Sequence, residues 1–162
     1  MAVATQNEFK RDILNTDTNE KVTSILQKNL TNLIDLALLM KQAHWNVVGS
    51  GFRSIHLQLD EIIATVRNAS DEVAERISAL GVAADGRSST VAQYSDLTAY
   101  PREFVPVTET ISLVADAVKT ATDSLRHAIS EMAELDPITE DLLIATTGPM
   151  EKHLWMLQAQ EI

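Results

Sequence analysis

The sequence predicts an all-α protein: a bundle of four long helices with a long connection between the second and the third. Apolar residues recur at helical spacing over long windows, and no stretch shows a clear strand signal. The 162 residues include only five glycines and four prolines, and 4% are aromatic, which favours long helices over a turn-rich sandwich. Because 45% of the residues are hydrophobic, the chain can bury one sizeable core, and a single domain is expected.

The first helix is expected to follow a short arm. Residues 1–18 show no sustained periodicity and are interpreted as a mobile N-terminal arm, which leaves residues 19–162 as the bundle domain. Asn19 is a good N-cap residue, and Gly49 and Gly51 stop a helix that runs from there to Val48. Its buried stripe comprises Leu26, Leu30, Leu33, Ala37, Met40 and, at its end, His44.

The second helix is expected from Ser54, as its cap, to Leu80, and Gly81 ends it. Residues 82–104 then form a long connection in which the segment VAQYSDL is a candidate short helix. A connection of this length is typical of a crossover that lets two helices of a four-helix bundle run parallel.

The third helix should span Val107 to Glu134. Asp136 then caps a fourth helix with Pro137 in its first position, and this helix runs to the end of the chain. Gly148-Pro149 should kink it, because proline has no N–H and clashes with the preceding turn. The predicted architecture is therefore a ferritin-like bundle or another four-helix arrangement with a long crossover.

Charge and composition restrict the partners and the compartment. The formal charge is −10, which opposes general attraction to nucleic acid. The N-terminus lacks the layout of a signal peptide, and no apolar run reaches the roughly 18 residues of a membrane span. The absence of cysteine excludes disulfides and thiolate metal sites. A soluble, cytoplasmic protein without a membrane partner is expected.

Five side chains of the segment 41–75 are candidate metal ligands. They are His44, His56, Asp60, Asp71 and Glu75. Nitrogen and oxygen ligands of this kind suit a divalent transition metal, iron included, and zinc could occupy the same ligands. Taken singly, such a histidine is more often a hydrogen-bonded core residue than a metal ligand, and such carboxylates usually form the solvent-exposed face of a helix. Four of the five, however, share an arc of about 100° beside the apolar stripe, where unpaired charge is costly.

One helix cannot close this site. His56 with Asp60, and Asp71 with Glu75, form i, i+4 pairs, but Asp60 and Asp71 are three turns, or about 16 Å, apart. A second copy packed antiparallel about a two-fold axis would bring one pair against the other and create two equivalent sites. In that arrangement His44 joins His56 and Asp60 of its own chain.

The residues around these ligands resemble the Dps family, the mini-ferritins known as DNA-binding proteins from starved cells. The resemblance covers nearly the whole chain. It rests on Lys41-Gln42-Ala43-His44-Trp45-Asn46, Ile55-His56, Leu59-Asp60, Asp71 and Ala74-Glu75-Arg76, and extends through Ala99-Tyr100-Pro101 and Lys152-His153-Leu154-Trp155.

The resemblance implies a hollow, tetrahedral homododecamer with ferroxidase centres between two-fold-related subunits. His44, His56 and Asp60 would come from one subunit, and Asp71 and Glu75 from its partner. Family members oxidise Fe(II), usually with hydrogen peroxide in preference to oxygen, and store ferric mineral inside the shell, which protects against oxidative damage. The alternative is a DNA-compacting structural protein of the nucleoid with little ferroxidase activity.

Two departures from the family concern charge. Members that bind DNA directly often use a lysine-rich terminal arm, whereas the first twenty residues here carry two basic and four acidic side chains. DNA binding is therefore expected to be weak or absent. Gly148-Pro149-Met150 stands where related chains typically carry charged residues, so the salt bridges of that interface are not carried over.

Two further sets of residues have alternative interpretations. Trp45 is either a hydrogen-bonded structural indole, which we favour, or an electron donor beside the site. An acidic group at the third helix's end is either a solvated corner with Asp136 as a cap, or an acidic three-fold pore through which iron enters. That group comprises Glu131, Glu134, Asp136, Glu140 and Asp141. His127 and His153 are read as surface or interface residues.

Overall fold

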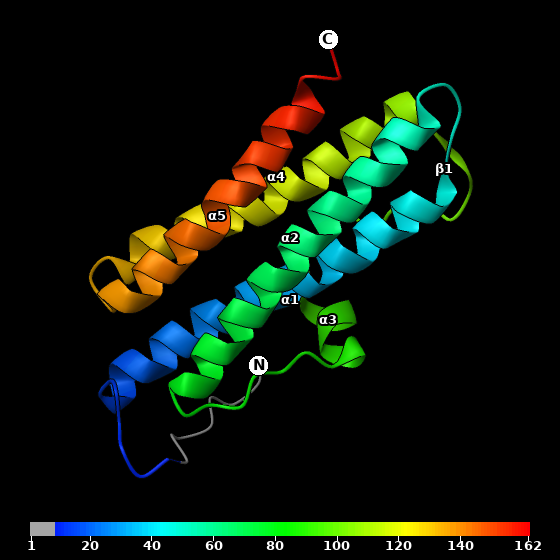
Figure 1. Cartoon of the computed structure of the whole chain (residues 1–162). Coiled ribbons are helices and arrows are strands. Elements are labelled where there is room, and N and C mark those ends of the chain that lie inside the picture. Colours follow the sequence, from blue (N-terminus) through cyan, green and yellow to red (C-terminus); the bar gives the residue numbers. More distant parts are fainter. Residues whose placement is uncertain (1–8) are drawn as a thin grey trace.

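The computed structural model describes residues 9–162 and confirms the predicted all-α bundle. Figure 1 shows α1 and α2 as one antiparallel pair, α4 and α5 as another, and the short α3 of the crossover beside α1. The elements are α1 (Thr16–Asn46), β1 (Val47–Val48), α2 (Phe52–Ala79), α3 (Ser88–Tyr94), β2 (Val105–Pro106), α4 (Val107–Met132) and α5 (Pro137–Gln158).

The first helix begins three residues before its predicted start. The side chain of Asn15 accepts a hydrogen bond from the Thr18 backbone N–H at 3.0 Å and caps α1. Asn19, the predicted cap, is instead 6% exposed within α1 and donates to the carbonyl oxygen of Leu80 at 3.0 Å. Of the predicted arm, residues 1–8 lie outside the described part, residues 9–15 precede the helix, and the last three belong to α1.

The second helix starts two residues before Ser54 and ends at Ala79, one residue before its predicted end, and Gly81 follows the C-cap Leu80. Gly51, with φ at 82°, is its N-cap in place of Ser54. At the other end Gly81 has φ at 83°, and the N–H groups of Gly81 and Val82 donate to the carbonyls of Ser78 and Ile77 at 2.9 and 3.3 Å. This pair of hydrogen bonds is the Schellman arrangement that a glycine favours at a helix C-terminus.

A two-residue parallel ladder was not predicted. Val47 and Val48 of β1 pair with Val105 and Pro106 of β2, so the end of α1 is tied to the end of the crossover. The expectation of no strand was wrong here because two residues are too few to show an alternating pattern.

The core lies along the predicted apolar stripes. The large side chains that are essentially fully buried come from all four long helices, and include Leu26, Leu30, Leu33, Leu36, Met40, Ile55, Leu59, Ile62, Ile77, Leu125, Met132, Leu143, Met150 and Leu157. Within the described residues, no helix combines the length and apolar character needed to cross a bilayer. The fold therefore places the segment 41–75 around the α1–α2 turn and along α2.

Candidate metal centre

Two histidines meet where α1 ends and α2 begins. The rings of His44 and His56 stack with centroids 3.6 Å apart and planes inclined by 23°. The Nδ1 atom of each ring lies 2.9 Å from the backbone carbonyl oxygen of the other residue. Because a carbonyl oxygen only accepts, both Nδ1 atoms carry protons, so in the neutral form of either ring the lone pair is on Nε2. A metal ligand needs that lone pair, and the second hydrogen bond fixes the orientation of the ring.

The turn between the helices makes this pairing possible. Gly49 and Gly51 both have positive φ, which lets the chain reverse within a few residues. His44 is only 7% exposed, and the ring of Phe52 lies 4.9 Å from that of His56. The reciprocal bonds thus hold both rings rigidly at the bundle's end.

Asp60 lies beside this pair but is held by a lysine. Its Oδ1 is 2.6 Å from the Nζ of Lys41 and 3.4 Å from the Nδ1 of His44. The hydrogen bond from Lys41 lowers the pKa of Asp60, so the carboxylate is ionised at neutral pH. Sequence reasoning missed Lys41 as a neighbour of the site, although its position one turn before His44 is a usable signal.

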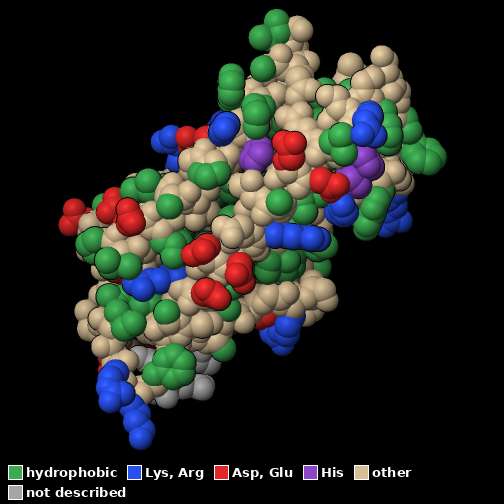
Figure 2. Space-filling model, viewed as in Figure 1, with side chains coloured by type: hydrophobic (Ala, Val, Ile, Leu, Met, Phe, Trp, Pro, Cys, Tyr) green, Lys and Arg blue, Asp and Glu red, His purple; other side chains and the backbone are tan. Residues whose placement is uncertain are grey.

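Asp71 and Glu75 do not join the histidines within one chain. Both are exposed and lie further along α2. In the part of the chain that the structure describes, no three His, Cys, Asp or Glu side chains are grouped so that they could hold a metal ion. Figure 2 shows acidic side chains spread over this face, some beside the histidines and others well away from them. The single chain therefore brings His44, His56 and Asp60 near one another without grouping them as a metal site, and it leaves Asp71 and Glu75 apart from them.

Trp45 is on the outside of the chain. It is 65% exposed although it directly follows the buried His44. The bundle core therefore does not cover the indole, and the favoured structural role would require a surface of another subunit.

Asp136 has a structural role. It is 4% exposed, caps α5 through the Ile138 N–H, and accepts from Thr139 and, at 2.7 Å, from Arg76 on α2. Burial opposes ionisation, but the hydrogen bonds from Thr139 and Arg76 outweigh it and hold the pKa of Asp136 below its usual value. The capping interpretation is confirmed, and a buried, paired carboxylate is not available to line a pore.

The other four pore candidates remain at the α4–α5 corner. Glu131, Glu134 and Asp141 are exposed and Glu140 is partly buried. Glu131 lies 3.5 Å from the Nε2 of His127, one turn earlier. Their grouping around a three-fold axis stays a prediction.

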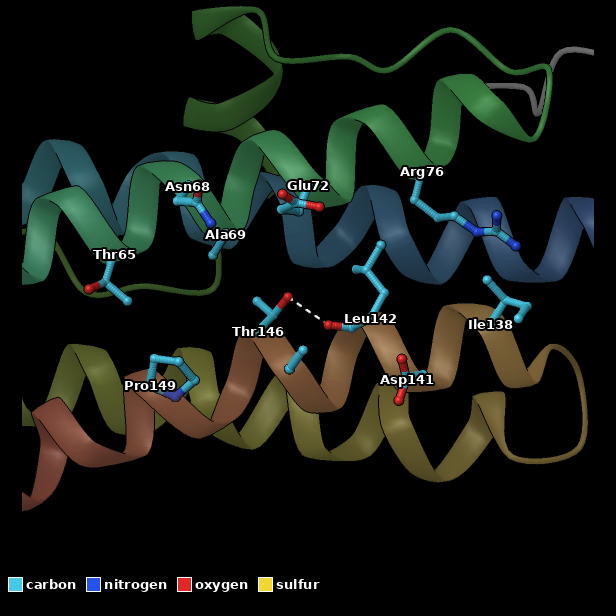
Figure 3. A pocket seen from close by; sticks show the side chains of 11 residues that line it. Thr65, Asn68, Ala69, Glu72, Arg76, Ile138, Asp141, Leu142, Thr146 and Pro149 are labelled. Atoms are coloured by element: carbon cyan, nitrogen blue, oxygen red, sulfur yellow. Dashed lines mark hydrogen bonds between the residues drawn. The ribbon is translucent and has the colours of Figure 1, made fainter.

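A groove of about 490 Å³ separates α2 from α5. Figure 3 shows Glu72 on the α2 wall and Asp141 on the α5 wall. Thr65 and Pro149 lie at one end, and Arg76 and Ile138 lie at the other. Sequence reasoning did not anticipate this groove, because it depends on how far apart the two helices pack.

Comparison with known proteins gives consistent matches. Residues 23–161 match the ferritin-like domain family. The chain is 36% identical over 142 residues to the fine tangled pili major subunit of Haemophilus ducreyi, covering 88% of this chain and 75% of that protein. It is 34% identical over 139 residues to a DNA protection during starvation protein of Agrobacterium fabrum, covering 85% and 86%. Among solved structures, a Dps from Microbacterium arborescens in the high iron form superposes with a TM-score of 0.87 at 31% identity, covering 93% and 98%.

Proposed function

Because the chain belongs to the Dps family of ferritin-like proteins, we propose that it oxidises Fe(II) at centres shared between subunits and stores the ferric product. The observation that carries this proposal is the pair of stacked histidines. Both rings have Nδ1 bound to a carbonyl, so both leave Nε2 for a metal, and the ionised Asp60 lies close to the pair, 3.4 Å from the Nδ1 of His44. The high iron form of the Microbacterium arborescens relative supports iron as the substrate.

The proposed centre needs two chains. His44, His56 and Asp60 form one half, and Asp71 and Glu75 of a two-fold-related copy form the other. Along α2, Asp71 lies about 16 Å and Glu75 about 22 Å from Asp60, so an antiparallel neighbour can present them to the histidine half. The same contact gives two identical centres per pair, and the family resemblance extends it to a hollow homododecamer.

The ligand set fits iron in both oxidation states. Imidazole nitrogen suits Fe(II), and carboxylate oxygen also binds the harder Fe(III). Two Fe(II) ions each give up one electron, and one hydrogen peroxide with two protons takes both electrons to form two water molecules. A two-electron reduction of this kind releases no hydroxyl radical. Oxygen is the second candidate oxidant, and zinc is a candidate for the same ligands.

The remaining acidic corner is proposed as the route for iron. Glu131, Glu134, Glu140 and Asp141 would form a negative pore that attracts Fe(II) toward the interior. The DNA-compacting alternative is disfavoured by the formal charge of −10 and by the acidic N-terminal segment. By removing Fe(II) and peroxide, the protein would protect DNA without binding to it.

Titration of the purified assembly with Fe(II) and stoichiometric peroxide tests the proposal. Absorbance follows ferric product, and sizing follows the shell. His44→Ala and Asp71→Asn should each abolish rapid oxidation while the assembly persists. His127→Ala, a change at an exposed histidine outside the centre, should retain it. Rapid oxidation in the first two variants would exclude the assigned centre.

A further inference from the structure

One histidine joins the C-terminal part of α5 to α2. The Nε2 of His153 on α5 lies 2.8 Å from the hydroxyl oxygen of Thr65 on α2. The same hydroxyl is 3.3 Å from the carbonyl oxygen of Glu61, one turn earlier. Thr65 has a single hydroxyl proton, and when it donates that proton to the carbonyl it can only accept from the ring. The proton of the neutral His153 ring is then on Nε2.

The second ring nitrogen of His153 has no partner. Among the described residues, its Nδ1 is buried and makes no hydrogen bond. A second proton placed on Nδ1 would be a buried donor without an acceptor, so the protonated ring is disfavoured while α5 is packed against α2. Burial accordingly lowers the pKa of His153; the charge of Glu61 on α2 opposes this shift and that of Lys152 on α5 adds to it. No charged group of α1 or α4 in the described part contributes.

The helix has a weak point one turn before His153. Pro149 lies inside α5 and has no N–H, so the carbonyl of Ala145 loses its usual helical partner. Gly148 precedes it, and a Cβ added there would meet nothing within 4 Å, so close packing does not require glycine at this position. Glycine adds backbone freedom next to the missing hydrogen bond. Although α5 is continuous here, Gly148 and Pro149 are therefore the positions at which it is most easily bent.

The Gly148-Pro149 step lies beside the groove between α2 and α5. Thr65 and Pro149 lie at one end of this groove, and Arg76 lies at the other (Figure 3). The Arg76 end is fixed by hydrogen bonds to Asp136 and Thr139 at 2.7 and 2.9 Å. At the Thr65 end, the bond to His153 joins the two helices across the seam.

We propose that His153 and Thr65 form a pH-sensitive latch, which holds residues 150–158 of α5 against α2 while His153 is neutral and releases them about the Gly148-Pro149 hinge when it is protonated. In the released segment the ring is in water, where its pKa is about 6.5. Because the pKa is lower in the closed seam, the contribution to closure is full above pH ~6.5 and is lost as the pH falls. At a pH one unit below that value, the ratio of molecules with the segment released to molecules with it closed should rise by up to about tenfold.

Hydrogen–deuterium exchange of the assembled protein tests the latch. Exchange of amides in residues 150–158 is compared at about pH 7.5 and about pH 5.5, after correction for the intrinsic effect of pH on exchange. The wild type should lose protection in this segment by up to about tenfold at the lower pH, while α4 does not. His153→Gln keeps a donor for Thr65 without a titrating ring, and its protection should be independent of pH. His127→Gln, at an exposed histidine of α4, should behave as the wild type.

Two results would overturn the latch. One is a wild type whose residues 150–158 stay equally protected at both pH values, and the other is a His153→Gln variant that still loses protection in acid. If that variant does not assemble, Thr65→Val serves in its place, because it removes the acceptor of the ring. Its residues 150–158 should exchange faster already at about pH 7.5, and wild-type protection there would equally contradict the latch.

Discussion

Mixtures of two inactive variants provide a quantitative test of the proposed shared centre. His56→Ala removes a ligand of the histidine half, and Glu75→Ala removes a ligand of the carboxylate half. Each variant alone leaves every centre incomplete. In a two-fold pair with one copy of each, one centre carries both defects and the other carries neither. Mixing should therefore restore activity that neither variant has by itself.

The expected size of the rescue follows from the two-fold geometry. Random pairing at equal concentrations makes about half of all pairs mixed, and each mixed pair has one intact centre of two, so about a quarter of wild-type centres should return. The two variants are unfolded together, refolded and sized. The initial rate of Fe(II) oxidation with peroxide and the number of tight Co(II) sites are then both expected near that fraction.

A matched mixture excludes other causes of rescue. His44→Ala with His56→Ala puts both defects in the same half, so no pairing creates an intact centre and the mixture should stay inactive. Mass spectrometry of the assemblies confirms that both variants are present in one shell. If such mixed shells of His56→Ala and Glu75→Ala oxidise iron no faster than their components, the centre is not shared in the proposed way.

Three further predictions address stability and metal binding. Arg76→Met leaves the buried Asp136 unpaired and should lower the free energy of unfolding by roughly 3–5 kcal/mol, whereas the double variant with Asp136→Leu should recover much of this loss. Denaturant titration measures both. Asn15→Ala removes the cap of α1 and should cost about 1 kcal/mol in the same assay, and no loss would contradict the observed helix start. Lys41→Met removes the hydrogen bond that lowers the pKa of Asp60, so the carboxylate of the variant is protonated at a higher pH. As the pH is lowered, Co(II) binding to the variant should therefore weaken earlier than binding to the wild type. Coincident binding curves would contradict this.

The helices could be predicted because their evidence is local. The apolar stripes and the glycine at position 81 each act within a few residues of the feature that they predict. The start of α1 could not be decided in this way, since Asn15 and Asn19 are equally suited to cap a helix. The choice depends on the bond from Asn19 to the carbonyl of Leu80, a residue 61 positions away. The two-residue ladder depends in the same way on a partner beyond the crossover.

The candidate ligands could be identified from sequence, but their hydrogen bonds could not. Helical spacing places Asp60 and His56 on one face, and it also shows that Asp71 lies too far along the helix to join them. It does not show that each histidine binds the other's carbonyl, or that Lys41 holds Asp60. The contact of His153 with Thr65 joins residues 88 positions apart, and the sequence pattern around neither residue indicates it. These contacts depend on packing between helices rather than on the period of one helix.

A centre divided between chains links iron binding to assembly. The stacked histidines and their carbonyl bonds are complete within one chain, so the histidine half is preorganised before any partner arrives. In the proposed centre its affinity for a metal would nevertheless be limited, because the carboxylates of Asp71 and Glu75 would come from the neighbour. A metal ion held by both halves stabilises the two-fold contact by mass action, and dissociation of that contact must weaken metal binding by the same factor. Fe(II) oxidation would then be confined to assembled protein, where the ferric product forms next to the interior that stores it.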